Sequence, residues 1–316
     1  MTIASLPAER GRLRTYASFV RFEHTLFSLP LIVAGIFCVP ARAMDATRWA
    51  LVAIAAVGAR TAAMSLNRLV DRRLDQLNPR TQVRELPSGA MKLREAFALL
   101  FASIAVYLVA CALLGSWYLQ VSPVPLAVFA LYPYLKRFTP LCHFGVGVAL
   151  ALAPLAGFAA AHPNLAEIAP ALLLAGFALL WVSGFDIIYA TLDESFDRAH
   201  RVHSMAAWLG RDRALRVSAV LHVAAFVCLI GAALAVLGVS RSHAITTGHG
   251  ANETLGLLAA GAPVATACLL AIAGTLLFLE QRWAENVNLA FFKVNVWVGV
   301  VVLAIVLAAR TAGGFS

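Results

Sequence analysis

Aspartates at helical spacing occur in the stretch NRLVDRRLDQLNPRT, which directly follows an apolar run of the chain. Asn67, Asp71 and Asp75 are four residues apart, so a helix would place them along one face. Carboxylates packed together repel each other and take up protons unless a cation lies between them. Mg²⁺ prefers oxygen ligands, and it commonly combines one or two carboxylates with substrate phosphate. The stretch therefore predicts a Mg²⁺ site for a phosphorylated substrate.

A second acidic stretch, DIIYATLDESFDRAH, repeats this arrangement later in the chain. Its polar residues are three or four positions apart, which favours one helix face, and they are Asp186, Tyr189, Asp193 and Asp197. The two stretches match at a constant separation, which suggests a distant internal duplication. Solvated helix ends are the alternative interpretation. Asp186 argues against it, because a carboxylate inside an apolar run costs roughly 2–3 kcal/mol on insertion scales.

Basic residues flank both acidic stretches. Arginine forks match the geometry of phosphate oxygens, so we expect some of these side chains to bind a diphosphate. The flanking arginines are Arg72, Arg73, Arg80, Arg84, Arg198 and Arg201. Another arginine, Arg60, lies in apolar sequence seven residues before Asn67, two helical turns away on the same face. An ionisable residue at this depth predicts a functional site.

The elements that must position these residues are membrane helices. The chain has 316 residues, of which 61% are hydrophobic and 13% are charged, whereas soluble domains are about one-quarter charged. Apolar runs of nearly the length needed to cross a bilayer as a helix recur throughout the chain. We expect an all-α polytopic membrane bundle of nine spans, with no sizeable soluble domain. The spans are expected near residues 24–40, 48–68, 95–115, 118–135, 141–161, 169–190, 214–239, 255–279 and 288–309.

The distribution of basic residues predicts the orientation of these spans. With the N-terminus in the cytoplasm, the great majority of the 25 Lys and Arg residues fall in inner segments, as the positive-inside rule requires. Both acidic stretches then lie at the cytoplasmic ends of their helices. The net charge of +9 is explained by this topology and does not imply nucleic acid. A signal peptide that ends at ARA (41–43) is the alternative for the first run, but its polar lead-in is too long.

The two acidic stretches resemble the aspartate signatures of the UbiA superfamily of intramembrane prenyltransferases. The signatures are Asn67-x3-Asp71-x3-Asp75 and Asp186-x2-Tyr189-x3-Asp193-x3-Asp197. The resemblance extends from Arg21 onward, so we expect a cytoplasmic segment (1–20) and a single prenyltransferase domain (21–316). It implies that a polyprenyl diphosphate ionises on Mg²⁺ between the two motifs. The allylic cation then attacks an aromatic ring, which loses a proton.

The resemblance also implies roles for individual residues. Metal binding is expected of Asn67, Asp71, Asp75, Asp193 and Asp197. Diphosphate binding is expected of Arg72, Arg80, Arg84, Tyr132 and Lys136, the last two from LYPYLKRFT. Binding of the aromatic acceptor is expected of Arg21, Arg60, Asn67 and Asp186. Tyr189 is expected to line the path of the cation and to be part of the catalytic set with the four paired aspartates.

The aromatic acceptor is predicted from the stretch RFEHTLFSLPLIVAG (21–35), which resembles a subgroup described as 4-hydroxybenzoate polyprenyltransferase. This implies a role in ubiquinone biosynthesis. Part of the subgroup instead prenylates 1,4-dihydroxy-6-naphthoate on the futalosine route to menaquinone, and Arg21 and Arg60 suit the carboxylate of either acceptor. A secondary transporter is a more distant alternative, since it also combines repeated halves with intramembrane ionisable groups. The expected partners are a polyprenyl diphosphate, an aromatic acid and the lipid bilayer, with the active site facing the cytoplasm from the inner (plasma) membrane.

Overall fold

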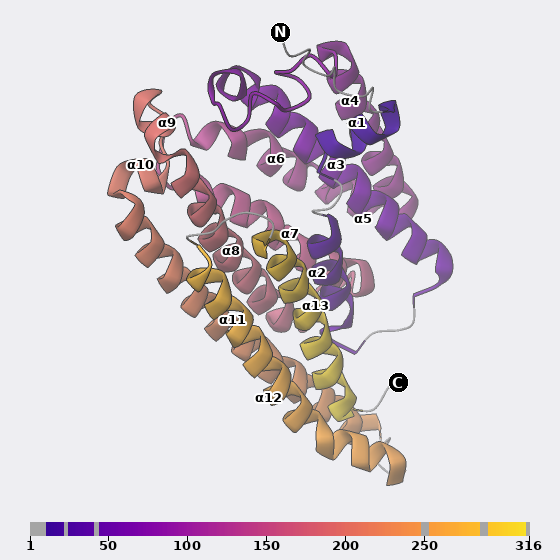
Figure 1. Ribbon diagram of the computed structural model, residues 1–316. Helices are drawn as coiled ribbons and strands as arrows, with labels where there is room; N and C mark the ends of the chain where they lie inside the picture. The colour runs from indigo at the N-terminus through magenta and orange to yellow at the C-terminus, as the bar shows by residue number, and fades with distance from the viewer. Residues whose placement is uncertain (1–10, 22–24, 41–43, 248–252, 285–289, 314–316) are drawn as a thin grey trace. The chain divides into compact units, whose positions relative to one another are not determined.

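The computed structural model describes residues 11–21, 25–40, 44–247, 253–284 and 290–313 (Figure 1). Every regular element in these ranges is a helix, so the predicted all-α fold is confirmed. The chain divides into two compact units. The first comprises Met1–Thr25 and Ala53–Pro133, and the second comprises Leu26–Val52 and Tyr134–Ser316.

The first unit contains all of α1, α4 and α5, and most of α3 and α6. The bounds are α1 (Arg12–Phe19), α3 (Ala46–Leu77), α4 (Leu93–Leu114), α5 (Ser116–Val121) and α6 (Pro123–Leu135). Phe19 at the end of α1 is fully buried and belongs to a small core with Met91 and Ala96. The carbonyl of Phe19 accepts a hydrogen bond from Arg68 Nε of α3 at 3.3 Å. The α1 segment is thus fixed to the polar end of α3.

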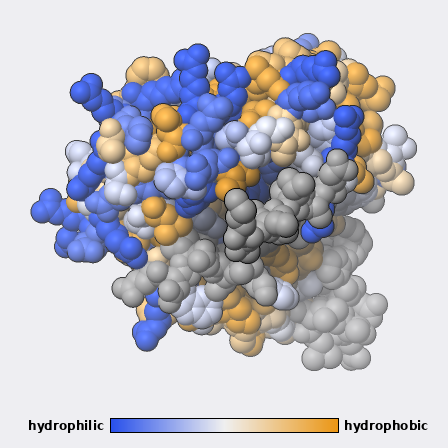
Figure 2. Space-filling model, turned by 45° about the horizontal axis from the view of Figure 1, so that its top comes forward, coloured by the Kyte–Doolittle hydropathy of each residue, from blue (hydrophilic) through white to orange (hydrophobic). Residues whose placement is uncertain are grey.

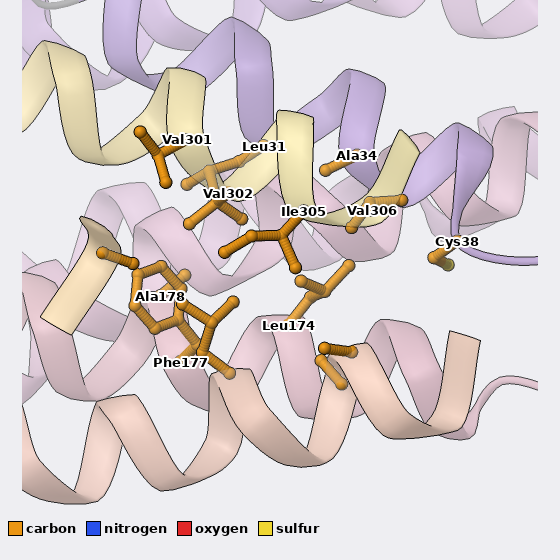
Figure 3. Packing of buried hydrophobic residues seen from close by; sticks show 14 of the residues in the cluster. Leu31, Ala34, Cys38, Leu174, Phe177, Ala178, Val301, Val302, Ile305 and Val306 are labelled. Carbon is orange, nitrogen blue, oxygen red and sulfur yellow. The ribbon is translucent and has the colours of Figure 1, made fainter. Parts of the chain in front are cut away.

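The second unit is organised around α8, which packs against both α7 and α11. Its helices are α2 (Thr25–Phe37), α7 (Cys142–Ala161), α8 (Ala169–Ala190), α9 (Glu194–Ala199), α10 (Met205–Leu209), α11 (Arg211–Thr247), α12 (Glu253–Arg282) and α13 (Ala290–Arg310). Figure 1 shows α11 alongside α8, and α12 alongside α13. The core between them is aliphatic and aromatic. In Figure 3, Ile305 of α13 lies near Leu174 and Phe177 of α8.

Buried polar side chains also connect the helices of the second unit. Trp181 Nε1 of α8 donates to Glu280 Oε2 of α12 at 3.2 Å, and Glu280 is completely buried. Gln281 Nε2 donates to Ser218 Oγ of α11 at 2.7 Å and lies 2.8 Å from His222 Nδ1. These bonds satisfy polar groups that would otherwise be stranded between apolar helices.

Seven of the described helices are long and apolar enough to cross a membrane. They are α3, α4, α7, α8 with its extension to Ala199, α11, α12 and α13. The other two predicted spans coincide with α2 and the α5–α6 pair; α2 and α6 have 13 residues each, fewer than the roughly 20 that span a bilayer. The count of nine therefore stays a prediction. Large apolar side chains such as Phe101 and Val220 are about two-thirds exposed, and Figure 2 shows orange hydrophobic surface. The chain is an integral membrane protein.

Glycines allow α2 and α7 to approach each other closely. A Cβ at Gly35 would overlap the carbonyl oxygen of Pro154, and a Cβ at Gly157 would overlap that of Ile32. Small residues at such positions permit backbone contact, which is how many membrane helices associate. At Gly261 of α12, by contrast, nothing lies within 4 Å of an added Cβ.

Alanine substitution should therefore have opposite effects at these two kinds of glycine. Gly157→Ala should lower the thermal unfolding midpoint in detergent, because separating α2 from α7 costs about 1–3 kcal/mol of packing. Gly261→Ala should leave the midpoint unchanged or raise it, because alanine is the better helix former. Equal midpoints for the two variants would show that the α2–α7 contact does not limit stability.

Candidate active site

The first acidic motif, Asn67, Asp71 and Asp75, lies on the last turns of α3, which continues to Leu77. Both aspartates are buried. Asn67 Nδ2 donates to the hydroxyl oxygen of Tyr132 at 3.0 Å. In this amide orientation the carbonyl oxygen of Asn67 is the atom that could bind a metal. The motif therefore offers oxygen donors of the kind that Mg²⁺ prefers, on one helix face as predicted.

The loop after α3 turns back on the helix and brings an arginine to the motif. Asn78 Oδ1 accepts from the backbone N–H of Arg80 at 2.9 Å, and Thr81 Oγ1 donates to the carbonyl of Asp75 at 3.2 Å. Such local side-chain bonds fix turns that end helices. Arg84 Nη1 then reaches Asp75 Oδ1 at 2.7 Å. The loop therefore lies against the first acidic motif, and diphosphate binding by its arginines stays a prediction.

Basic residues gather around this end of the first unit. The charged neighbours of Arg68 are Arg84, Arg21, Asp75 and Glu85. Arg21, Arg68 and Arg84 thus lie near one another, and arginine side chains suit the binding of a diphosphate. The sequence analysis gave Arg68 no role, and nothing in its spacing marks it, because its neighbours come from other segments. Arg21 is exposed, with a left-handed backbone (φ 49°) just after α1.

Three further predicted residues of this unit occupy different surroundings. Arg60 lies within electrostatic range of Tyr132, the residue that bonds Asn67. Arg72 is half-buried on α3, and Arg80 is exposed in the loop. Arg84 contacts the acidic motif directly, with its Nη1 atom 2.7 Å from Asp75 Oδ1.

The second acidic motif, Asp186, Tyr189, Asp193 and Asp197, is interrupted by a change of helical winding. Asp186 and Tyr189 lie on α8, a 3₁₀ turn covers Thr191–Asp193, and Asp197 lies on α9. The expectation of one continuous helix face is wrong here. Thr191 Oγ1 donates to the carbonyl of Ile188 at 2.7 Å, and such side-chain bonds compete with the α-helical pattern. The 3₁₀ turn is wound more tightly than the α-helices on either side of it.

Polar partners surround the carboxylates of the second motif. Asp186 Oδ2 lies 2.7 Å from His143 Nδ1 of α7. Asp197 is buried, hydrogen-bonds Ser204, and has Asp193 and Lys136 as charged neighbours. The structure thus brings the predicted Lys136 to this motif. Tyr189 packs beside Ile188 and Ala284, which lies two residues after the end of α12. His143 was not predicted, and its only sequence signal is a histidine at the start of an apolar run.

Metal binding can be judged from the donor atoms. Within the described ranges, no three His, Cys, Asp or Glu side chains form a ready-made metal cluster. Each motif instead supplies a pair of aspartates, and the first adds the Asn67 amide. Carboxylate and amide oxygens fit Mg²⁺, which takes its remaining ligands from water and phosphate. The residues therefore fit Mg²⁺ better than a softer metal such as zinc.

Comparison with known proteins identifies the class. The UbiA prenyltransferase family matches residues 28–252. The chain belongs to this family, and it is an integral membrane prenyltransferase. This membership sets aside the secondary transporter alternative.

Relatives and solved structures agree with the family. The chain is 28% identical to the "4-hydroxybenzoate octaprenyltransferase" of Acidovorax ebreus over 304 residues, 95% of this chain and 97% of that protein. It is also 28% identical to the protein of that name from Coxiella burnetii over 205 residues, 64% of this chain and 71% of that protein. A UbiA homologue from Aeropyrum pernix K1 is 32% identical with a TM-score of 0.74, covering 90% of this chain and 97% of that one. An Archaeoglobus fulgidus UbiA homologue bound to GPP and Mg²⁺ has the same fold, with a TM-score of 0.63 at 16% identity over 94% of this chain and 99% of that one.

The hydrogen bond between Tyr132 and Asn67 should matter for metal use. Tyr132→Phe removes the hydroxyl that orients the Asn67 amide, and a net hydrogen bond of this kind corresponds to roughly a threefold to tenfold effect. We expect the Mg²⁺ concentration for half-maximal activity to rise by that factor. Tyr134→Phe, in the same LYPYLKRFT segment, is the matched control and should leave it unchanged. An unchanged Mg²⁺ requirement in Tyr132→Phe would remove Asn67 from the metal site.

Proposed function

We propose that this protein transfers a polyprenyl group from polyprenyl diphosphate to 4-hydroxybenzoate, with Mg²⁺, in ubiquinone biosynthesis. The observation that carries the proposal is the pair of carboxylate motifs at the polar ends of apolar helices, in which Asp71, Asp75 and Asp197 are buried and basic side chains lie near both motifs. The names of the curated relatives support 4-hydroxybenzoate as the acceptor. The Archaeoglobus homologue solved with GPP and Mg²⁺ supports a prenyl diphosphate and this metal.

The metal is assigned to the paired aspartates. Asp71 and Asp75 with Asn67 would hold Mg²⁺ in the first motif, and Asp193 and Asp197 would hold Mg²⁺ in the second. When bound, Mg²⁺ neutralises the negative charge that develops on the leaving diphosphate. Oxygen donors alone make up this set, in keeping with a hard cation.

The basic residues are assigned to the diphosphate. Arg84 bonds Asp75 in the present structure at 2.7 Å, and a bound diphosphate would offer it phosphate oxygens in addition. Arg72, Arg80, Lys136 and the hydroxyl of Tyr132 complete this set. These donors stabilise the electron pair that stays on the diphosphate when the allylic carbon–oxygen bond breaks. Arg68 adds positive charge beside them.

The remaining residues are assigned to the aromatic acceptor and the cation. Arg60 and Arg21 would bind the acceptor carboxylate, while Asn67 and Asp186 orient the acceptor ring. Tyr189 would face the allylic cation, whose positive charge an aromatic ring stabilises. The apolar helices exclude the water that would quench this cation. A new carbon–carbon bond forms at the ring, and the ring then loses a proton.

We also propose how the domain is oriented in the membrane. Residues 21–316 form one prenyltransferase domain, preceded by a cytoplasmic segment (1–20) whose first ten residues lie outside the described ranges. The active site faces the cytoplasm from the inner (plasma) membrane. The basic inner segments support this orientation.

A competition assay tests the acceptor. Purified protein in lipid receives Mg²⁺, a long-chain prenyl diphosphate and equal amounts of 4-hydroxybenzoate and 1,4-dihydroxy-6-naphthoate, and mass spectrometry identifies the products. Prenylated hydroxybenzoate supports the proposal. A prenylated naphthoate would instead assign the protein to menaquinone biosynthesis. Release of diphosphate without either product would contradict an aromatic acid of this kind as acceptor.

Replacement of one aspartate in either motif should abolish turnover. Asp71→Asn and Asp193→Asn keep the size of the side chain but remove its negative charge, so we expect kcat to fall roughly 100-fold or more. Thermal midpoints should stay close to that of the unsubstituted protein. Asp212→Asn, at an exposed position in the first turn of α11, is the matched control and should retain full activity. Near-normal turnover in both active-site variants would refute the assignment of metal and diphosphate to these motifs.

A further inference from the structure

His143 connects the second acidic motif to the segment that follows α9. Its side chain is almost completely buried, whereas one-third of the Asp186 side chain remains accessible. His143 Nδ1 lies 2.7 Å from Asp186 Oδ2. On the other side of the ring, His143 Nε2 accepts the backbone N–H of Met205 at 3.1 Å. Both ring nitrogens are therefore used inside the protein.

These partners determine where the ring proton lies. A backbone N–H can only donate, so Nε2 must present its lone pair to Met205. The proton of a neutral imidazole is then on Nδ1, where it is donated to the Asp186 carboxylate. With both nitrogens used and almost no exposed surface, His143 cannot itself contact substrate. Its function must be exerted through Asp186 and Met205.

The segment around Met205 is fixed to the same place by further bonds. The backbone N–H of His203 donates to the carbonyl of Lys136 at 2.7 Å, and Cys142 Sγ donates to the carbonyl of His203 at 3.3 Å. Ser204 accepts the N–H of Ala207 as the N-cap of α10, and it also bonds Asp197. The segment 203–205 therefore links the start of α7 to the second acidic motif.

We propose that His143 is a positioning residue that couples the Asp186 carboxylate to the segment 203–205, and so holds Asp186 in the orientation that binds the aromatic acceptor. This inference rests on the proposed function, because it takes Asp186 as an acceptor-binding residue. One carboxylate oxygen is fixed by the imidazole, and the accessible part of the side chain is turned toward substrate. Displacement of Met205 would release the ring and, with it, Asp186.

Two isosteric substitutions separate the two bonds of His143. In His143→Asn, the amide nitrogen can replace the Nδ1 donor to Asp186 but cannot reach Met205. In His143→Gln, the amide oxygen can replace the Nε2 acceptor of Met205 but the Nδ1 donor is lost. His162→Gln is the matched control, since His162 is a second buried histidine, at the opposite end of α7.

Steady-state kinetics of the full chain in lipid, with 4-hydroxybenzoate, a long-chain prenyl diphosphate and Mg²⁺, give the readout. We expect His143→Gln to raise the KM for the acceptor about tenfold or more, the size expected for a lost hydrogen bond to a charged group. The KM for the prenyl diphosphate should stay within about twofold of the value for the unsubstituted protein, because the substitution affects only the binding of the acceptor. His143→Asn should recover most of the acceptor KM, and His162→Gln should match the unsubstituted protein.

The combination of substitutions at both partners provides a second readout. If His143 acts through Asp186, then Asp186→Asn and His143→Gln should have non-additive effects on the acceptor KM. An unchanged acceptor KM in His143→Gln would overturn the proposal. Equal increases in both KM values, with a lowered thermal midpoint, would also overturn it by showing a purely structural role. If the unsubstituted protein prenylates no aromatic acid, the proposed function itself is refuted. This outcome is distinct from the others because it is measured on the unsubstituted protein alone.

Discussion

A polar side chain buried on an apolar helix of this protein is stabilised by a partner within the protein, because the membrane interior offers no water to replace that partner. Asp75 meets Arg84, Asp186 meets His143, and Glu280 meets the indole of Trp181. Each pair joins two different segments of the chain. These bonds lower the free-energy cost of burying a polar group. They therefore also help to determine which segments of the chain lie together.

This constraint connects the loops to the chemistry. The loop after α3 is held by Asn78 and Thr81, and only in that conformation does Arg84 reach Asp75. In the second unit, a Cβ at Gly184 would overlap the His222 ring, so the glycine leaves room for the imidazole that bonds Gln281. The turn residues after α3 thus fix Arg84, a group that the proposed reaction requires. Stability and function are linked at these positions, so a substitution that loosens a loop should also affect substrate binding.

The sequence predicts much of this arrangement because helical periodicity is a local property. The spacing of Asn67, Asp71 and Asp75 correctly predicts one face of α3, and the apolar runs correctly predict the helical segments. The 3₁₀ turn before α9 was not predicted, because it accompanies a side-chain bond of Thr191 that competes with the regular helix. His143 was not predicted either, since its partners Asp186 and Met205 lie 43 and 62 residues away in sequence. Long-range pairing of this kind leaves no periodic signal in a single sequence.

We propose that each acidic motif takes part in binding a metal-bound prenyl diphosphate. The most direct test is the equilibrium affinity of the full chain for a prenyl thiodiphosphate, which resists ionisation, measured with Mg²⁺ and again with a chelator. The account predicts that Asp71→Asn and Asp193→Asn each raise Kd about tenfold or more with Mg²⁺, and that the chelator abolishes the difference between these variants and the unsubstituted protein. An unaltered Kd in either variant with Mg²⁺ would contradict a role of that motif in binding the metal and the diphosphate.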